Sequence, residues 1–208
     1  IVHCKVDPGN IRCIAKVINH KEGAAYPMLA KTPLKDFIPG YYGNHEINGK
    51  EYLVIKDLTS GFASPSVGDF KVGTRHYDLD ATPEKIQELT EKEENTTTRS
   101  IGVRIIDVCT RKEGKKVHHW GKKDGLKLDR DGLKDAVAKF FPTKHLRTSF
   151  VEKLESFIAA LEETIKENPG FRVYASSILV TYDGDADLDK AELRLNLIDF
   201  AHLYIDIS

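Results

Sequence analysis

The chain has 208 residues, of which 40% are hydrophobic and 30% charged, and its 31 Lys and Arg residues nearly balance 32 Asp and Glu residues. This composition is typical of a globular protein in water, and no apolar run approaches the roughly 18 residues that a membrane-spanning helix needs. A net charge of −1 argues against a protein that coats a long nucleic acid, which usually requires a broad basic face.

The N-terminal sixty residues predict a small lobe rich in β-strands. Alternating apolar residues indicate a strand over 11–16, and the apolar run 52–55 indicates a buried strand. Between them, residues 21–30 predict a short helix that buries Ala25, Met28 and Leu29. We place the end of this lobe and its hinge at residue 60, so that the connector over 56–64 lines a cleft.

The remaining residues, 61–208, predict a larger C-terminal lobe of mixed helices and strands. Thr82 followed by Pro83 is a typical helix start, because the hydroxyl caps the helix and proline suits its first turn. Apolar spacing predicts further elements: a strand at 101–105, helices at 133–141 and 151–165, and strands at 171–182 and 193–200. The predicted fold class is therefore α+β, with a small lobe on a larger one.

Three cysteines, Cys4, Cys13 and Cys109, are widely spaced among apolar residues. Their number and spacing match neither a disulfide framework nor a metal-binding pattern. We therefore expect a reducing compartment, the cytoplasm, with the nucleus as an additional location.

The segment Pro65–Arg75 contains Pro-x-x-x-Asp-x-Lys-x-Gly, with Asp69 and Lys71 two residues apart. In an extended segment these two side chains point to the same side, because strand side chains alternate. Such a pair can bind a nucleotide hydroxyl and a phosphate, or the two groups can simply pair with each other.

A second carboxylate, Asp199, lies at the end of the last predicted strand. Leu193, Leu195 and Leu197 alternate toward the interior, and the spacing predicts that Asp199 continues this face. A buried carboxylate needs a compensating cation, and Mg²⁺ is a natural candidate because it takes one or two carboxylates plus phosphate oxygens. The alternative is an acid that reaches water at the strand end.

Lys16 follows a predicted strand and precedes a predicted helix that contains Glu22, an order also found for the phosphate-anchoring lysine and helical glutamate of protein kinases. Ser176 and Ser177 begin the partner of the last strand and could approach a phosphate. The sequence contains no Walker A loop and no Gly-x-Gly-x-x-Gly motif. It also lacks His-Arg-Asp, which excludes an ordinary protein kinase.

Between Arg111 and Arg130 the sequence has eight Lys or Arg residues and three acidic ones, together with His118, His119 and Trp120. A short basic segment on a nearly neutral protein suits a compact polyanion. The alternative is a lysine-rich hairpin or loop that only contacts solvent.

Three motifs in this order resemble the inositol polyphosphate kinase family. They are Pro65-x-x-x-Asp69-x-Lys71-x-Gly73, Ser176-Ser177-Ile178-Leu179 and Ile198-Asp199-Phe200-Ala201-His202. The resemblance extends from about residue 14 to 202 and leans toward inositol hexakisphosphate kinases, with some features of multikinases. Gly68 and His76 depart from the family pattern, which usually has a bulkier apolar residue and a glutamine there.

The resemblance implies a bilobal fold of the ATP-grasp or protein-kinase-like type. It also implies ATP and Mg²⁺ as cofactors, an inositol phosphate as small-molecule substrate, and an inositol-binding segment at about 76–130. We expect no nucleic-acid or membrane partner and a monomer.

The resemblance also implies roles for single residues. Lys16 would hold ATP phosphates, the backbones of Lys56 and Leu58 would read adenine, and Ser177 would lie near the phosphates. Asp69, Lys71 and Asp199 would be catalytic, with Asp69 also on the ribose, Lys71 on phosphates and Asp199 on Mg²⁺. The inositol phosphate would be bound by Lys71, Lys92, Lys122, Lys123 and His202.

The expected reaction is transfer of the ATP γ-phosphoryl group to inositol hexakisphosphate, which gives a diphosphoinositol pentakisphosphate. The first alternative is a trisphosphate 3-kinase or multikinase activity, alone or in addition. The second is a catalytically silent module that binds inositol phosphates.

Overall fold

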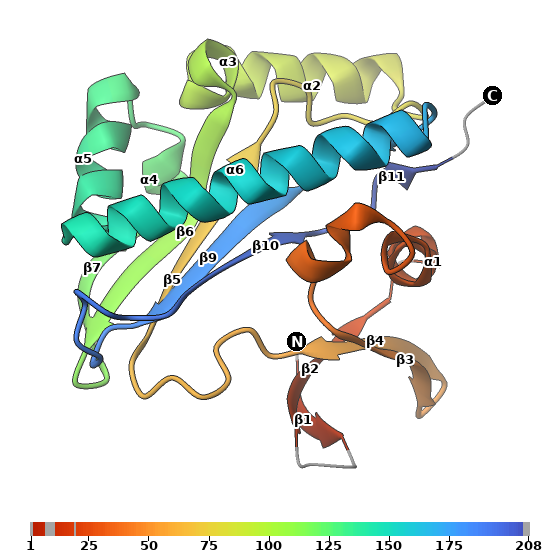
Figure 1. The fold of residues 1–208 in the computed structure, drawn as a ribbon. Helices are drawn as coiled ribbons and strands as arrows, with labels where there is room; N and C mark the ends of the chain where they lie inside the picture. The colour runs from red at the N-terminus through yellow and green to blue at the C-terminus, as the bar shows by residue number, and fades with distance from the viewer. Residues whose placement is uncertain (1, 7–10, 19, 206–208) are drawn as a thin grey trace.

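A computed structural model describes residues 2–6, 11–18 and 20–205, and it contains two main antiparallel sheets (Figure 1). The smaller sheet comes from the N-terminal residues in the order β1-β2-β4-β3. Its strands are β1 (Val2–Val6), β2 (Ile11–Val17), β3 (Tyr41–Ile47) and β4 (Lys50–Lys56). Helix α1 (His20–Leu29) and a 3₁₀ helix (Pro33–Phe37) connect β2 to β3.

The larger sheet has the order β10-β9-β5-β6-β7. Its strands are β5 (Pro65–Val72), β6 (Val103–Lys112), β7 (Lys115–Trp120), β9 (Ser177–Asp183) and β10 (Leu193–Ile198). A short pair, β8 (Arg172–Val173) with β11 (Leu203–Tyr204), lies beside it. The helices are α2 (Pro83–Glu93), α3 (Thr97–Ile101), α4 (Lys122–Gly125), α5 (Arg130–Phe140) and α6 (Lys144–Glu167).

Helices α5 and α6 lie on one face of the larger sheet, and α6 runs diagonally across it in Figure 1. Phe70 of β5 packs edge-on against Phe140 of α5, with ring centroids 5.8 Å apart, and the hydroxyl of Tyr182 donates to the Phe140 carbonyl over 2.6 Å. Because strand residues alternate, Asp69 and Lys71 project to the face of the larger sheet opposite Phe70. The apolar core therefore fixes the direction of both motif side chains.

The α+β, kinase-like fold is confirmed, but several local predictions are wrong. Met28 is 39% exposed rather than buried, because Ala25, Tyr26 and Leu29 form the buried face of α1. Ile101 belongs to α3 instead of a strand, since Gly102 ends that helix in the left-handed conformation (φ 71°). The boundary at residue 60 remains a prediction.

The strand predicted over 171–182 is broken in the structure. It divides into β8 and β9 because Ala175 adopts a left-handed conformation with φ 57°. Helix α6 exists as predicted, but Val151, Ile158 and Ile165 are exposed, whereas Leu146 and Phe157 are buried. None of the described helices is long and apolar enough to cross a membrane.

Candidate nucleotide and phosphate site

A cavity of about 210 Å³ lies between the two sheets, where the connector after β4 joins them. Both parts of the chain contribute to its wall. The lining residues are Ile14, Lys16, Glu22, Tyr26, Pro39, Ile55, Lys56, Asp57, Leu58, Thr59, Leu179, Ile198 and Asp199. Apolar side chains with two lysines and three carboxylates suit a flat heterocycle attached to charged groups.

Lys16 is the central cation of this cavity. Its Nζ lies 3.0 Å from Glu22 Oε1 on α1 and 3.0 Å from Asp199 Oδ1 after β10. Burial alone would lower the pKa of Lys16, but the two carboxylates outweigh burial and raise that pKa above its usual value. The ammonium is therefore held charged between the two parts of the chain, as phosphate binding requires.

Asp199 does not continue the buried face of β10, so the sequence expectation is wrong at this residue. The strand ends at Ile198, and Asp199 has a left-handed backbone with φ 65°. Its side chain is 49% exposed, and the Ser176 hydroxyl donates to its carbonyl over 2.9 Å. Aspartate tolerates this conformation better than most residues, and the turn directs the carboxylate into the cavity rather than into the core.

Asp69 and Lys71 lie on the same side of β5, as predicted, but Lys71 forms its hydrogen bond elsewhere. Lys71 Nζ donates to the carbonyl of Ala175 over 3.0 Å. Burial, and next the charge of Arg104, lower the pKa of Lys71. An ammonium whose solvation is reduced in this way interacts more strongly with a phosphate.

Asp69 is a partly buried acid with unused acceptor capacity. Its Oδ1 atom is buried and has no hydrogen-bond partner among the described residues. Burial raises the pKa of Asp69 to about 6, and a hydrogen bond from Ser177 offsets only part of that effect. An orphaned carboxylate oxygen of this kind is suited to accept a ligand hydroxyl.

Lys56 and Leu58 of the connector line the cavity. The Lys56 amide donates to the Gly40 carbonyl over 2.8 Å, and the Leu58 carbonyl accepts from Arg194 Nη1 over 3.1 Å. Asp57 fixes the turn, because its Oδ1 accepts from the Thr59 amide and hydroxyl. These bonds hold the connector in one conformation against the cavity.

The remaining predicted residues are spread over three elements outside the lining of this cavity. His202 pairs through Nδ1 with Asp78 Oδ2 at 2.8 Å, in the loop before α2. Lys92 is exposed in the last turn of α2. Lys122 and Lys123 are exposed in α4, which lies so close to β6 that Gly125 leaves no room for a Cβ beside the Ile105 carbonyl.

The basic segment 111–130 does not form one surface. Its first half is the exposed β6–β7 hairpin, whose turn contacts Ser64 through a bond from the Gly114 amide to Ser64 Oγ. This turn and Lys71 lie at opposite ends of the sheet, since β5 begins beside the turn and reaches Lys71 near its other end (Figure 1). Only α4 returns toward that end.

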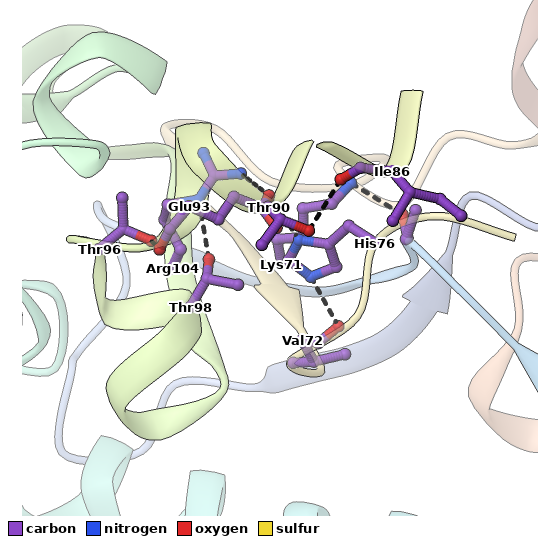
Figure 2. A network of polar contacts seen from close by, with 10 residues as sticks. Lys71, Val72, His76, Ile86, Thr90, Glu93, Thr96, Thr98 and Arg104 are labelled. Carbon is purple, nitrogen blue, oxygen red and sulfur yellow. Dashed lines mark hydrogen bonds and ion pairs between the residues drawn. The ribbon is translucent and has the colours of Figure 1, made fainter. Parts of the chain in front are cut away.

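Sequence reasoning missed a buried polar network beside Lys71. Figure 2 shows Arg104 of β6 and His76 converging on Glu93 of α2. Arg104 is 3% exposed and Glu93 7% exposed. Glu93 belongs to a strongly acidic stretch that suggests a solvent-facing helix, so the sequence contains no signal that would single it out.

The residues present fit a divalent cation bound together with phosphates. The described residues contain no cluster of three or more acidic, His or Cys side chains that would hold a metal alone. Mg²⁺ needs only one or two carboxylates when phosphate oxygens complete its coordination. Asp199, half exposed in the cavity wall and opposite Lys16, provides such a carboxylate.

Comparison with known proteins identifies similar chains. The sequence model of the family described as inositol polyphosphate kinase matches residues 52–208. Inositol hexakisphosphate kinase 2 of Oryctolagus cuniculus is 32% identical over 139 residues, covering 66% of this chain and 33% of the relative. An inositol polyphosphate kinase of Schizosaccharomyces pombe is 31% identical over 183 residues, covering 76% of this chain and 18% of its own length.

A solved structure extends the similarity to three dimensions. The inositol phosphate multikinase Ipk2 of S. cerevisiae, in complex with ADP and Mn²⁺, has a TM-score of 0.77 and 25% identity. The match covers 94% of this chain and 90% of the other. The chain spans about a third of the length of the hexakisphosphate kinase relative, so the two proteins are compared over that part alone.

Proposed function

Because the chain belongs to the inositol polyphosphate kinase family, we propose that it transfers the γ-phosphoryl group of ATP to inositol hexakisphosphate. The bond between the β-γ bridging oxygen and the γ-phosphorus breaks, and a phosphate oxygen of the acceptor forms a new bond to that phosphorus. The products are ADP and a diphosphoinositol pentakisphosphate. The observation that carries the proposal is the Lys16–Asp199 contact of 3.0 Å across the cavity.

On the nucleotide side, the proposal assigns adenine to the backbones of Lys56 and Leu58, which line the cavity. Asp69 accepts a ribose hydroxyl through its free Oδ1. Lys16 holds the phosphates, and Ser177 lies near them beside Asp69. Asp199 would hold Mg²⁺, which when bound neutralises charge on the phosphates.

On the acceptor side, Lys71 neutralises the transferred group and the acceptor phosphates. Phosphoryl transfer depends on positioning and electrostatic stabilisation more than on covalent chemistry by the protein. Lys92, Lys122, Lys123 and His202 supply further positive or hydrogen-bonding groups from elements around the Lys71 end of the sheet. The β6–β7 turn does not contact the acceptor, because it lies at the end of the larger sheet away from Lys71.

A second candidate acceptor is a less phosphorylated inositol. The specific observation in its favour is the fold match to a multikinase over 94% of this chain. Both candidates use the same nucleotide site and differ only in the acceptor.

The test incubates the protein with Mg²⁺-ATP and either inositol hexakisphosphate or inositol trisphosphate, and resolves products by anion exchange. We expect a product that elutes later than hexakisphosphate. Asp199→Asn should abolish it, while Asp189→Asn, a surface change outside the cavity, should not. Turnover of trisphosphate alone would support the second candidate, and binding without turnover of either would indicate a silent binding module.

A further inference from the structure

Glu93 lies at the end of α2 and joins two basic side chains from different segments (Figure 2). Its Oε1 atom accepts from His76 Nδ1 over 2.7 Å and from Arg104 Nη2 over 3.2 Å. All three residues are less than a tenth exposed. A buried ionic group of this kind is rarely the most stabilising solution, which makes a positioning role worth testing.

The network continues beyond Glu93 on both sides. Arg104 Nε donates to Thr98 Oγ1 of α3 over 3.1 Å, and His76 Nε2 lies 3.3 Å from the Val72 carbonyl at the end of β5. Both ring nitrogens of His76 thus face oxygen acceptors, one on a side chain and one on the backbone. The end of β5, the loop before α2, and both helices α2 and α3 are therefore joined to β6.

Helix α2 depends on this network for its position. Among its residues Glu93 is the one that is buried, and the helix has no fully buried apolar side chain to anchor it. Most of its surface is polar, so packing energy contributes little to where it lies. An ion pair with two hydrogen bonds fixes both the distance and the direction of its last turn.

The network also touches the proposed catalytic lysine. Arg104 lies directly opposite Lys71 in the register of β5 and β6. Residues directly opposite on antiparallel strands project to the same face. Arg104 therefore connects the Glu93 network to the strand position from which Lys71 extends.

We propose that Glu93 is a positioning residue that fixes the acceptor-binding helix α2, and with it Lys92, relative to Lys71. The inference rests on the proposed function, because it assigns α2 to the acceptor side of that reaction. Glu93 itself touches neither substrate. Its role is to hold α2 at a fixed distance from β5, so that Lys92 and Lys71 contact the same acceptor molecule.

The first test is Glu93→Gln, with KM measured separately for the inositol phosphate and for ATP. We expect the acceptor KM to rise about tenfold, as small misplacements of positioning groups do, while the ATP KM changes less than about twofold. Glu94→Gln, the exposed neighbour, is the matched control and should change neither. Unchanged constants, or an equal rise in both, would overturn the inference.

Because Glu93→Gln leaves buried Arg104 without its carboxylate and can unfold the protein, a second variant keeps the ion pair. Thr98→Val is nearly isosteric and removes only the acceptor for Arg104 Nε. A rise in acceptor KM alone, smaller than that of Glu93→Gln, is expected, and constants equal to wild type would refute the positioning role. Wild-type turnover in the same assay separates failure of this inference from failure of the proposed function.

Discussion

At the scale of single residues, Asp69 is ionised at a cost to the fold. Burial raises its pKa to about 6, above the value of about 3.9 in an unfolded chain. Between these two values the folded state binds the proton more tightly, so this residue's contribution to stability falls as pH rises through that window. Above pH 6 the whole cost of the buried charge is present.

Asp69→Asn should therefore stabilise the protein while impairing nucleotide binding. At pH 7.5 we expect a gain in unfolding free energy of up to about 3 kcal/mol, from roughly two pKa units at 1.36 kcal/mol each. The gain should shrink to less than about 1 kcal/mol near pH 4, where wild-type Asp69 is neutral in the folded state and about half neutral in the unfolded chain. Urea unfolding at both pH values measures it, and an equal effect at both would contradict the buried-charge explanation.

Lys71→Met tests the other half of the same motif. The side chain keeps its length and loses its charge, so we expect kcat to fall on the order of a hundredfold or more. Lys134→Met, on the exposed surface of α5, is the control and should retain wild-type kcat. A rise in KM with unchanged kcat would make Lys71 a ground-state contact instead.

At the scale of elements, β5 explains why glycine stands at position 68. A Cβ there would lie 2.6 Å from Phe70 Cε2 and 2.9 Å from Phe140 Cζ. The space beside Gly68 on the inward face of β5 is therefore occupied by these two aromatic rings. The Phe140 ring occupies the space that the family's usual bulkier side chain at position 68 would need. This departure is visible in the sequence, but its compensation depends on a contact between β5 and α5 that is distant in the chain.

Gly68→Ala should consequently overpack the contact between β5 and α5. We expect a loss of about 1–3 kcal/mol in unfolding free energy, because both rings must shift. The control is Ala24→Gly at an exposed site of α1, which reports only helix propensity. Gly49→Ala is not used, because Gly49 has φ 71° and alanine would be strained there. Thermal or urea unfolding of Gly68→Ala with no loss would show that the aromatic pair moves freely.

The same scale shows what sequence patterns predicted and what they did not. Alternation placed Asp69 and Lys71 on one side of β5 because a strand fixes that geometry locally. It failed at Asp199, since the left-handed turn after β10 breaks the alternation. Spacing found α6 and part of its core-facing side, Leu154 and Leu161, but it also assigned exposed residues to that side, because apolar residues cover more than one side of the helix.

At the scale of the whole molecule, contacts between distant segments determined what sequence reasoning missed. The ordered motifs predicted the kinase-like fold and the residues around the cavity. Glu93 and Arg104 were missed because nothing local distinguishes a buried glutamate from its solvent-exposed neighbours. The same limit applied to the β6–β7 turn. Its position at the far end of the sheet from Lys71 follows only from the strand register.

The contact between Lys16 and Asp199 joins the two parts of the molecule, so ligand binding there should stabilise both together. A ligand at a hundred times its Kd adds about 2.7 kcal/mol to the unfolding free energy. We expect ATP with Mg²⁺ to raise Tm more than ATP with EDTA. Asp199→Asn should lose that Mg²⁺-dependent difference, whereas Asp189→Asn should keep it.

Because Asn still fills the space of Asp199 but weakens its pairing with Lys16, the variant's own Tm without ligand measures the structural part separately. If Asp199→Asn kept the full Mg²⁺-dependent shift, the metal would be held by other groups, and the role of Asp199 would be reduced to orienting Lys16.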